Sequence, residues 1–263
     1  MHNNAPIGIF DSGVGGTSIW KEMHALLPRE NTCYLADSAH APYGEKPERE
    51  IVRLSIKNTE KLLAMGCKLI VVACNTATTN AISLLRKNYS VPFIGIEPAI
   101  KPATLQSKNK SIGILATKGT LGSTLFHKTS KTFAKDISVV EVIGEGIVPR
   151  IENGDLSSEG LKTTLQQCIR PMLAANVDYI VLGCSHYPHI LPLLKTLVPQ
   201  HVTIIDSGKA VARQTQAVLK RNKSLRKGTT PPSLRFFTNA GPRTLQQLLK
   251  NYRETVEISV LDF

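Results

Sequence analysis

Short runs rich in Ile, Val and Leu alternate along the chain with longer stretches in which apolar residues recur every three or four positions. The short runs predict β-strands and the longer stretches predict amphipathic α-helices. Strands that alternate with helices are typical of βαβ units built around parallel sheets, so the pattern favours an α/β fold. We expect strands at residues 7–10, 32–36, 69–73, 93–96, 112–115, 138–142, 179–182, 202–205, 234–238 and 257–261.

Two of the helical stretches carry recognisable ends. One contains Leu54 and Leu62 in its apolar stripe and is expected to end before Gly66, because glycine is the preferred residue after a helix C-terminus. Another contains Leu165 in its stripe and follows Ser157 and Ser158, either of which suits a helix N-cap.

An internal repeat organises the pattern. The strand at residues 7–10 recurs 105 positions later at residues 112–115, and the strand that ends in Cys74 recurs 110 positions later as the one that ends in Cys184. Two matched pairs at nearly equal offset indicate a duplication, and therefore two similar α/β domains that face each other. Residues after Asp206 exceed the second repeat and are expected to pack back onto the first domain. We assign residues 1–97 with 207–263 to the first domain and residues 98–206 to the second.

Composition narrows the class of protein. The chain has 263 residues, of which 42% are hydrophobic, which is enough for one large domain or two smaller ones. No apolar run reaches the roughly 20 residues of a membrane span, and the first residues lack the pattern of a signal peptide. The five cysteines are scattered and form no C-x-x-C pair, so we expect reduced thiols rather than disulfides, zinc ligands or a redox motif.

The formal net charge of +12 leaves open a basic protein that binds nucleic acid. The densest basic clusters, at residues 108–110 and 220–227, lack the interleaved aromatic residues of a single-strand binding platform. We therefore interpret both clusters as solvated faces and do not expect nucleic acid as the primary partner.

Cys74 and Cys184 are the candidate reactive groups. Ligands of open parallel sheets bind outside the carboxyl ends of the strands, so two facing domains would place these thiols opposite each other across a cleft. Each precedes an expected helix start, where the helix dipole lowers the pKa of a thiol toward neutrality. The other three cysteines are interpreted as small buried hydrophobic residues, Cys33 and Cys67 without polar partners and Cys168 on an apolar helix stripe.

Two opposed thiols suit the removal of a proton from one face of a carbon atom and its return to the other face. Asp11, after the first strand, could orient or deprotonate one thiol, and His186 could do the same for Cys184. The glycine-rich turn at residues 13–16 exposes backbone N–H groups that can hold a carboxylate. Its spacing does not meet the dinucleotide-binding pattern, so a nucleotide is not expected there.

These residues stand in motifs that resemble the glutamate racemases, within the family of cofactor-independent aspartate and glutamate racemases. The resemblance runs from residue 7 to about residue 206. It is carried in family order by Phe10-Asp-Ser-Gly-Val-Gly-Gly16, Ala36-Asp-Ser-Ala-His-Ala-Pro-Tyr-Gly44, Ala73-Cys-Asn-Thr76, Glu97-Pro98, Val148-Pro-Arg-Ile-Glu-Asn-Gly154 and Gly183-Cys-Ser-His-Tyr-Pro188. The family's fold, two α/β domains related by pseudo-twofold symmetry with the site in the cleft between them, agrees with the repeat.

The resemblance implies a role for each matched residue. Cys74 and Cys184 would be the acid/base pair, one on each face of the substrate Cα, assisted by Asp11 and His186 respectively. Glu152 would be an auxiliary polar residue. The substrate's ammonium and carboxylates would be held by Asp11, Ser12, Tyr43, Gly44, Asn75, Thr76, Ser185 and His186. The family usually has Thr where this chain has Ser185, so we expect the hydrogen bond to persist with slightly looser packing.

The resemblance further implies interconversion of L-glutamate and D-glutamate without cofactor or metal. It also implies a homodimer in a bacterial cytoplasm that supplies D-glutamate for peptidoglycan, and so for cell-wall biogenesis and cell shape. Family members differ in dimer arrangement, and some depend on a cell-wall precursor as activator; the sequence assigns neither property. A related racemase, such as one for aspartate, stays open, because one methylene in a pocket is worth only about 1–3 kcal/mol.

Overall fold

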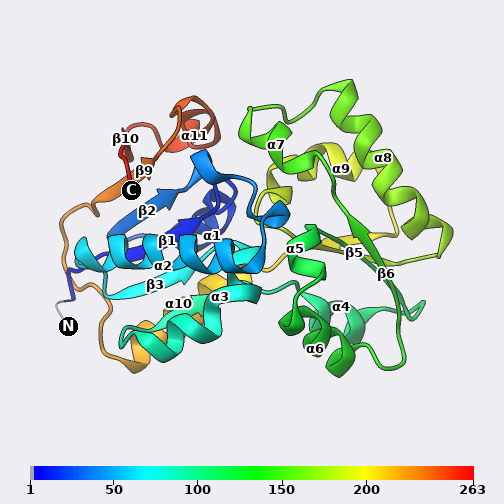
Figure 1. The fold of residues 1–263 in the computed structure, drawn as a ribbon, viewed down its shortest axis with the longest axis horizontal. Helices are drawn as coiled ribbons and strands as arrows, with labels where there is room; N and C mark the ends of the chain where they lie inside the picture. Colours follow the sequence, from blue (N-terminus) through cyan, green and yellow to red (C-terminus); the bar gives the residue numbers. More distant parts are fainter. Residues whose placement is uncertain (1–2) are drawn as a thin grey trace.

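The computed structural model describes residues 3–263, which fold around parallel β-sheets (Figure 1). The strands are β1 (Ile7–Asp11), β2 (Thr32–Ala36), β3 (Leu69–Val72), β4 (Phe93–Gly95), β5 (Ser111–Ala116), β6 (Ser138–Ile143), β7 (Tyr179–Gly183), β8 (Thr203–Ile205), β9 (Leu234–Thr238) and β10 (Glu257–Val260). The α-helices are α1 (Thr17–Leu26), α2 (Glu48–Ala64), α3 (Asn75–Asn88), α4 (Ile100–Gln106), α5 (Lys118–Leu121), α6 (Thr124–Phe133), α7 (Ile147–Glu152), α8 (Glu159–Ala174), α9 (Leu191–Leu197), α10 (Gly208–Arg221) and α11 (Arg243–Leu248). Short 3-10 helices are η1 (Ser38–His40), η2 (Tyr43–Glu45), η3 (Tyr187–Ile190) and η4 (Lys250–Tyr252).

The strands form two parallel sheets with one strand order in common. The first sheet runs β10-β9-β2-β1-β3-β4 and the second β6-β5-β7-β8. The order β2-β1-β3-β4 is therefore repeated by β6-β5-β7-β8, in agreement with the duplication seen in the sequence. The α/β fold class with two similar parallel sheets is confirmed, and all ten expected strands are present among residues 3–263.

The end of the chain returns to the first sheet. β9 pairs in parallel with β2, and β10 extends the same edge beyond β9. Figure 1 shows this return: the orange and red segments of the C-terminal part lie against the blue strands of the N-terminal part. We propose the two sheet-centred units, residues 1–97 with 207–263 and residues 98–206, as the two domains.

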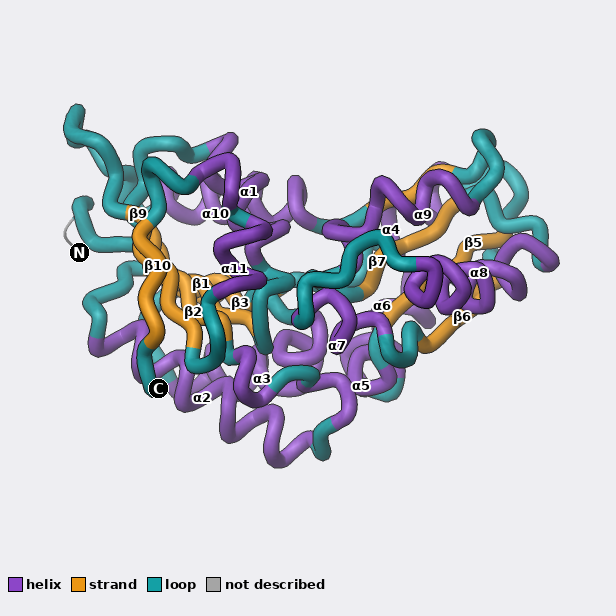
Figure 2. Tube along the Cα trace, turned by 90° about the horizontal axis from the view of Figure 1, so that it is seen from above, coloured by secondary structure: helices purple, strands orange, loops and turns teal. Residues whose placement is uncertain are grey.

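Both sheets are covered by helices on their two faces, because their buried strands are apolar on both sides. In the first sheet Ile9 and Val71 pack with residues of α1 and α10, whereas Phe10 and Val72 pack with residues of α2 and α3. Figure 2 shows α1 and α10 on one side of this sheet and α2 and α3 on the other. The second sheet is likewise enclosed, by α8 and α9 on one face and α4 and α6 on the other.

The predicted helix ends are confirmed. Gly66, just after α2, has a φ of +77°, a left-handed conformation that glycine adopts without strain. Ser158 is the N-cap of α8, and its Oγ accepts a hydrogen bond of 3.1 Å from the Leu161 N–H. Local sequence therefore sets the bounds of both helices.

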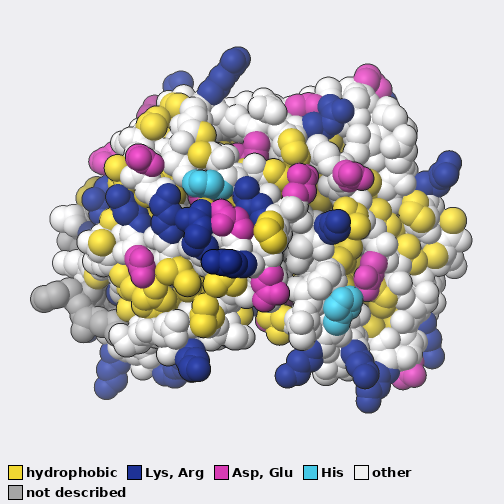
Figure 3. All heavy atoms as spheres, in the orientation of Figure 1, with side chains coloured by type: hydrophobic (Ala, Val, Ile, Leu, Met, Phe, Trp, Pro, Cys, Tyr) yellow, Lys and Arg dark blue, Asp and Glu magenta, His cyan; other side chains and the backbone are white. Residues whose placement is uncertain are grey.

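The surface of residues 3–263 is charged and mixed. Figure 3 shows Lys and Arg gathered over α2 on one face, with Asp and Glu among them. None of the helices in this part of the chain has the length and apolar character needed to span a bilayer.

Candidate active site

The two predicted thiols meet at one cavity. Cys74 follows β3 and is the N-cap of α3, where its Sγ accepts a hydrogen bond of 3.4 Å from the Ala77 N–H. Cys184 directly follows β7, which holds the same place in the second sheet as β3 in the first. Both side chains are buried and line a cavity of about 10 Å³. Residues that are 110 positions apart in the repeat are thus brought to one small space between the sheets.

Most of the predicted substrate-binding residues line the same cavity. Its walls are formed by Ser12, Pro42, Tyr43, Gly44, Cys74, Asn75, Thr76, Thr117, Val148, Cys184, Ser185 and His186. Asp11 and Glu152 are not part of this lining, but each contacts a residue that is. A volume of about 10 Å³ holds about one water molecule, so the domains are closed on each other in this structure.

The protonation state of Cys74 differs from the expectation. Burial raises the pKa of this thiol to about 12, assisted by the negative charge of Asp11, although hydrogen bonds with Ala77 and Ser12 oppose the shift. The expected lowering at the helix N-terminus is therefore wrong for this closed arrangement, because removal of the thiolate from water outweighs the backbone N–H groups. Cys74 is a thiol at neutral pH, with its Sγ 3.6 Å from Ser12 Oγ.

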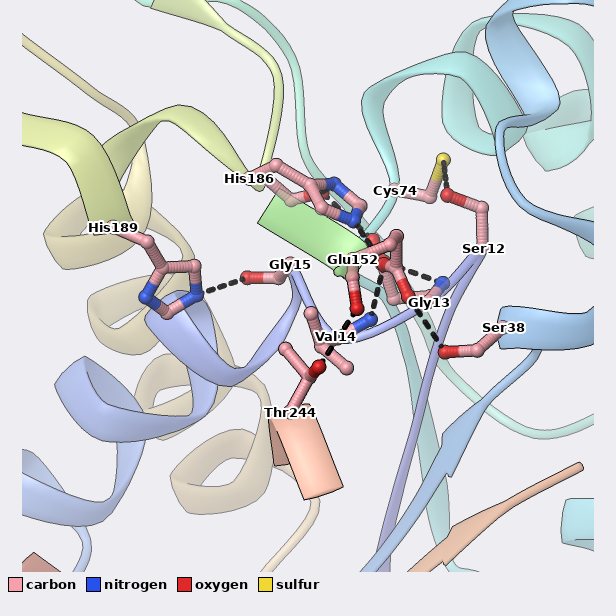
Figure 4. A network of polar contacts seen from close by, with 12 residues as sticks. Ser12, Gly13, Val14, Gly15, Ser38, Cys74, Glu152, His186, His189 and Thr244 are labelled. Carbon is pink, nitrogen blue, oxygen red and sulfur yellow. Dashed lines mark hydrogen bonds and ion pairs between the residues drawn. The ribbon is translucent and has the colours of Figure 1, made fainter. Parts of the chain in front are cut away.

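Beside Cys184 lies a charged relay of two residues. His186 Nδ1 is 3.8 Å from Cys184 Sγ. On the other side of the ring, His186 Nε2 is 2.5 Å from Glu152 Oε1 (Figure 4). Burial disfavours the imidazolium, but the hydrogen bonds with Cys184 and Glu152 and the charge of Asp11 outweigh it, so the pKa of His186 is raised well above its ordinary value. An imidazolium held in this way can exchange a proton with the sulfur of Cys184.

The glycine-rich turn binds carboxylates of the protein itself. The Val14 N–H donates to Glu152 Oε1 at 2.8 Å, and the Gly13 N–H donates to Asp11 Oδ1 at 2.9 Å. The turn thus holds carboxylates, as expected of its N–H groups, but they come from α7 and β1. A Cβ on Gly13 would lie 1.9 Å from Glu152 Oε1, and one on Gly15 would lie 2.2 Å from His186 Nδ1. Glycine is required here because side chains of the other domain approach the backbone.

Asp11 reaches across to the second domain. It is fully buried, and its Oδ2 accepts a hydrogen bond of 2.7 Å from Ser185 Oγ. The Ser185 hydroxyl therefore bonds to a carboxylate of the first sheet, and its expected hydrogen bond with the substrate stays a prediction. Burial raises the pKa of Asp11, while His186 and Ser185 act in the opposite direction. Among residues 3–263 the hydrogen bonds of Asp11 do not include Cys74, so its assistance to that thiol stays a prediction.

Two predicted binding residues are placed in different ways. The Tyr43 hydroxyl donates to the Asp37 carboxylate and accepts from Asn58 Nδ2, so its hydroxyl group is occupied within the first domain. Asn75, by contrast, is buried, and its side-chain oxygen and nitrogen have no hydrogen-bond partner among the described residues. A buried amide without partners costs about 1–3 kcal/mol, which a polar ligand in the cavity would offset.

The sequence interpretation missed Pro42, Thr117 and Val148. Thr117 Oγ1 lies 2.9 Å from Thr76 Oγ1, so the two domains are joined by hydroxyl groups at the edge of the cavity. A signal for Thr117 was present, since it stands 105 positions after Ser12, the same offset as between the first strands of the repeat. Both hydroxyl residues directly follow the central strand of their sheet.

A larger open pocket adjoins the small cavity. It measures about 450 Å³ and shares Pro42, Gly44, Thr117 and Val148 with the cavity wall. Glu45 and Lys118 lie on its outer lining. The open pocket therefore adjoins the cavity that the two thiols line.

Comparison with known proteins gives one consistent family. Residues 7–215 match the Asp/Glu/Hydantoin racemase family. A glutamate racemase of Cupriavidus pinatubonensis is 41% identical, over 97% of this chain and 96% of that protein. The fold matches the crystal structure of a glutamate racemase of Bacillus anthracis with a TM-score of 0.89 and 28% identity, over 100% of this chain and 99% of the other. It also matches the Escherichia coli glutamate racemase in complex with L-glutamate and the activator UDP-MurNAc-Ala, with a TM-score of 0.84 and 31% identity, over 98% of this chain and 100% of the other.

Proposed function

We propose a function from the premise that this chain belongs to the Asp/Glu/Hydantoin racemase family, and within it to the glutamate racemases. The proposed reaction is the interconversion of L-glutamate and D-glutamate by proton transfer at Cα. The observation that carries the proposal is the meeting of Cys74 and Cys184, from equivalent places in two similar sheets, at one closed cavity. Each thiol serves one face of the substrate carbon. One accepts the Cα proton as a thiolate, and the other, as a thiol, donates a proton to the opposite face.

The surroundings of the two sulfurs differ. Cys74 is a thiol in the resting enzyme, because burial raises its pKa to about 12. Cys184 lies beside the His186 imidazolium, through which a proton can be exchanged. Cys74 can therefore supply the new Cα proton without a prior change of its own protonation state. The opposite direction requires a proton to leave Cys74 first.

The amino acid is held by polar groups of both domains. Ser12, Asn75 and Thr76 supply donors from the first domain, and Ser185 and His186 supply them from the second. Tyr43 and Gly44 close the wall between the cavity and the open pocket. Fixed donors in a dry cleft stabilise the negative charge that develops when Cα loses its proton. Closure of the domains removes water and brings both sulfurs within reach of one carbon.

The test is direct. Purified protein without added pyridoxal phosphate or nucleotide converts L-glutamate to D-glutamate, as followed by chiral chromatography, and exchanges the Cα hydrogen for deuterium in D₂O. Cys74→Ala and Cys184→Ala each abolish racemisation. Cys168→Ala, which removes a buried thiol of α8 outside the cavity, is the matched control and keeps activity. Full activity in either of the first two variants contradicts the two-thiol assignment.

The relatives that match this chain are glutamate racemases, which favours glutamate over aspartate as the substrate. The ratio of kcat/KM for the two amino acids decides between them.

The proposal extends to a homodimer in the cytoplasm that supplies D-glutamate for peptidoglycan. Expression of the gene in a bacterium that requires D-glutamate restores growth without the supplement if this role is correct, and the Cys184→Ala variant does not. Sedimentation of the purified protein reports the oligomeric state.

A further inference from the structure

A second pair of cysteines lies at the opposite end of the first sheet from the cavity. Cys33 is near the amino end of β2, and Cys67 lies just before β3, whereas Cys74 follows the carboxyl end of β3. Gly8 of β1 is in register with Cys33. A Cβ on Gly8 would lie 3.0 Å from both Cβ and Sγ of Cys67, so the missing side chain leaves the space that Cys67 fills. Cys33 and Cys67 thus both lie beside Gly8 and belong to the same buried cluster, which makes the two thiols neighbours.

The guanidinium of Arg235 lies beside the two cysteines and contacts Cys33. Arg235 of β9 is in register with Cys33, and its Nη2 donates a hydrogen bond of 3.1 Å to Cys33 Sγ. Cys33 is buried, as predicted, but the expectation that it lacks a polar partner is wrong, because β9 joins this edge of the sheet from a distant part of the chain. Arg235 is only half-buried, so it connects Cys33 with the surface.

The pair differs from the catalytic thiols in reactivity. The hydrogen bond from Cys67 and the charge of Arg235 together outweigh burial and lower the pKa of Cys33 to about 7. The same contact raises the pKa of Cys67, which remains a thiol. Thiolates react with peroxides and thiols do not, so Cys33 is more reactive than the protonated Cys74.

We propose that Cys33 and Cys67 form a peroxide-reactive pair that closes into an intramolecular disulfide, a modification site separate from the catalytic cavity. The Cys33 thiolate attacks hydrogen peroxide, the O–O bond breaks, and the products are the sulfenic acid of Cys33 and hydroxide. Formation of the neutral sulfenic acid removes the negative charge that held the proton on Cys67. The Cys67 thiolate then attacks the Cys33 sulfur, the S–S bond forms, and hydroxide leaves and takes up the released proton as water.

Peptide mapping of the full-length protein tests the proposal without reference to activity. Reduced protein is treated with hydrogen peroxide in small molar excess, remaining thiols are blocked with N-ethylmaleimide, and the protein is digested without reductant. The expected product is a cross-linked peptide pair that contains Cys33 and Cys67 and is lighter by two hydrogen atoms, while Cys74, Cys184 and Cys168 carry the maleimide. Dithiothreitol reverses the cross-link.

Variants separate the roles of the three residues. Cys33→Ser and Cys67→Ser each abolish the cross-link, and Arg235→Gln slows its formation several-fold because the thiolate loses its cationic partner. Cys168→Ser is the matched control and leaves both yield and rate unchanged. The proposal is overturned if peroxide first modifies Cys74 or Cys184, if Cys33 is oxidised without bonding to Cys67, or if all five thiols stay reduced. Wild-type mapping decides among these outcomes even where a variant fails to fold.

Discussion

At the residue scale, the site depends on a buried imidazolium between a sulfur and a carboxylate. Glu152 accepts hydrogen bonds from His186, Val14 and Ser38. One carboxylate therefore binds the imidazolium, the glycine-rich turn and η1 together. A carboxylate with this many donors fixes the orientation of the imidazole as well as its charge. Glu152 is therefore a positioning residue that acts on Cys184 through His186.

Glu152→Gln is expected to lower kcat by about 10- to 100-fold, since a hydrogen bond to a charged group is worth about 1.5–3 kcal/mol. The variant should also lower the pKa of His186, because the carboxylate charge that favours the imidazolium is removed. Chiral chromatography gives the rate, and NMR of protein with labelled histidine gives the pKa. Glu159→Gln, on the exposed start of α8, is the control. An unchanged pKa of His186 would contradict the assigned role.

The charge of His186 also predicts how stability depends on pH. Its folded-state pKa is raised well above 6.5, so its stabilising contribution is complete below the unfolded-state value and is lost as the pH rises through the folded-state value. The difference in free energy of unfolding between the protein and His186→Asn should therefore be largest near pH 6 and smaller at alkaline pH. Urea denaturation at both pH values measures it, and a difference that grows with pH refutes the prediction.

The sequence identifies the two cysteines of the site, but it does not give the protonation states of the cysteines or their distant polar partners. Cys74 and Cys184 were found because the repeat marks equivalent strand ends. The pKa of Cys74 was predicted in the wrong direction, since the helix N-terminus is a local feature and the depth of burial depends on the other domain. Cys33 was assigned no polar partner for a similar reason, because Arg235 is distant in the sequence.

At the scale of elements, the glycine-rich turn between β1 and α1 is a close-packing surface. Gly15→Ala would place a Cβ 2.2 Å from His186 Nδ1 and displace the imidazole from Cys184. We expect a loss of activity of about 100-fold, which corresponds to a misplacement of about 1 Å in a catalytic group. Circular dichroism should show the fold retained. Gly241→Ala, where an added Cβ meets no atom within 4 Å, is the matched control and should keep full activity.

A buried ion pair joins the start of β3 to the returning chain. Lys68 Nζ lies 2.6 Å from Glu30 Oε2 and donates to the Ser224 carbonyl at 2.8 Å, while Glu30 Oε1 accepts from the Arg226 N–H at 2.7 Å. Lys68→Met leaves the Glu30 carboxylate buried without its cation, so we expect a destabilisation of about 3–5 kcal/mol. Urea denaturation measures the change. Lys87→Met, exposed on α3, should change stability little, and an equal effect in both variants would contradict the prediction.

The sequence predicts those elements whose pattern of apolar residues is contained within the element itself. All ten strands lie within about a residue of their expected bounds, because short apolar runs between longer helical patterns are a local signal of strands. The helices η1 and η2 were not predicted, since single turns of this kind have no periodicity to detect. Yet η2 contains Tyr43 and Gly44 and closes the cavity wall, so the least predictable element contributes directly to the site.

At the scale of the whole molecule, the cavity is too small for an amino acid until the domains separate. The Ser18 Oγ donates to the Ser185 carbonyl at 2.8 Å on the α1 side, and Thr76 meets Thr117 on the side of the open pocket. The open pocket adjoins only the second set of contacts. We therefore predict that substrate enters where the Thr76–Thr117 side opens, with the α1 side as the hinge.

Hydrogen–deuterium exchange can locate this opening. With D-glutamate bound, exchange should slow at the amides of α5 and η2 and stay unchanged at the start of α1, because ligand stabilises the closed arrangement on one side only. The Cys74→Ala and Cys184→Ala variants allow the measurement without turnover. Equal protection on both sides would place the hinge elsewhere.

The return of the chain to the first sheet has a consequence for biosynthesis. Residues 98–206 carry all four strands of the second sheet, whereas the first sheet needs β9 and β10 from residues 234–260 to be complete. A ribosome therefore releases every part of the second sheet before the last part of the first. Folding during translation should leave β2 as an unpaired edge strand until β9 has been made, so premature termination yields a complete second sheet and a first sheet with an aggregation-prone edge.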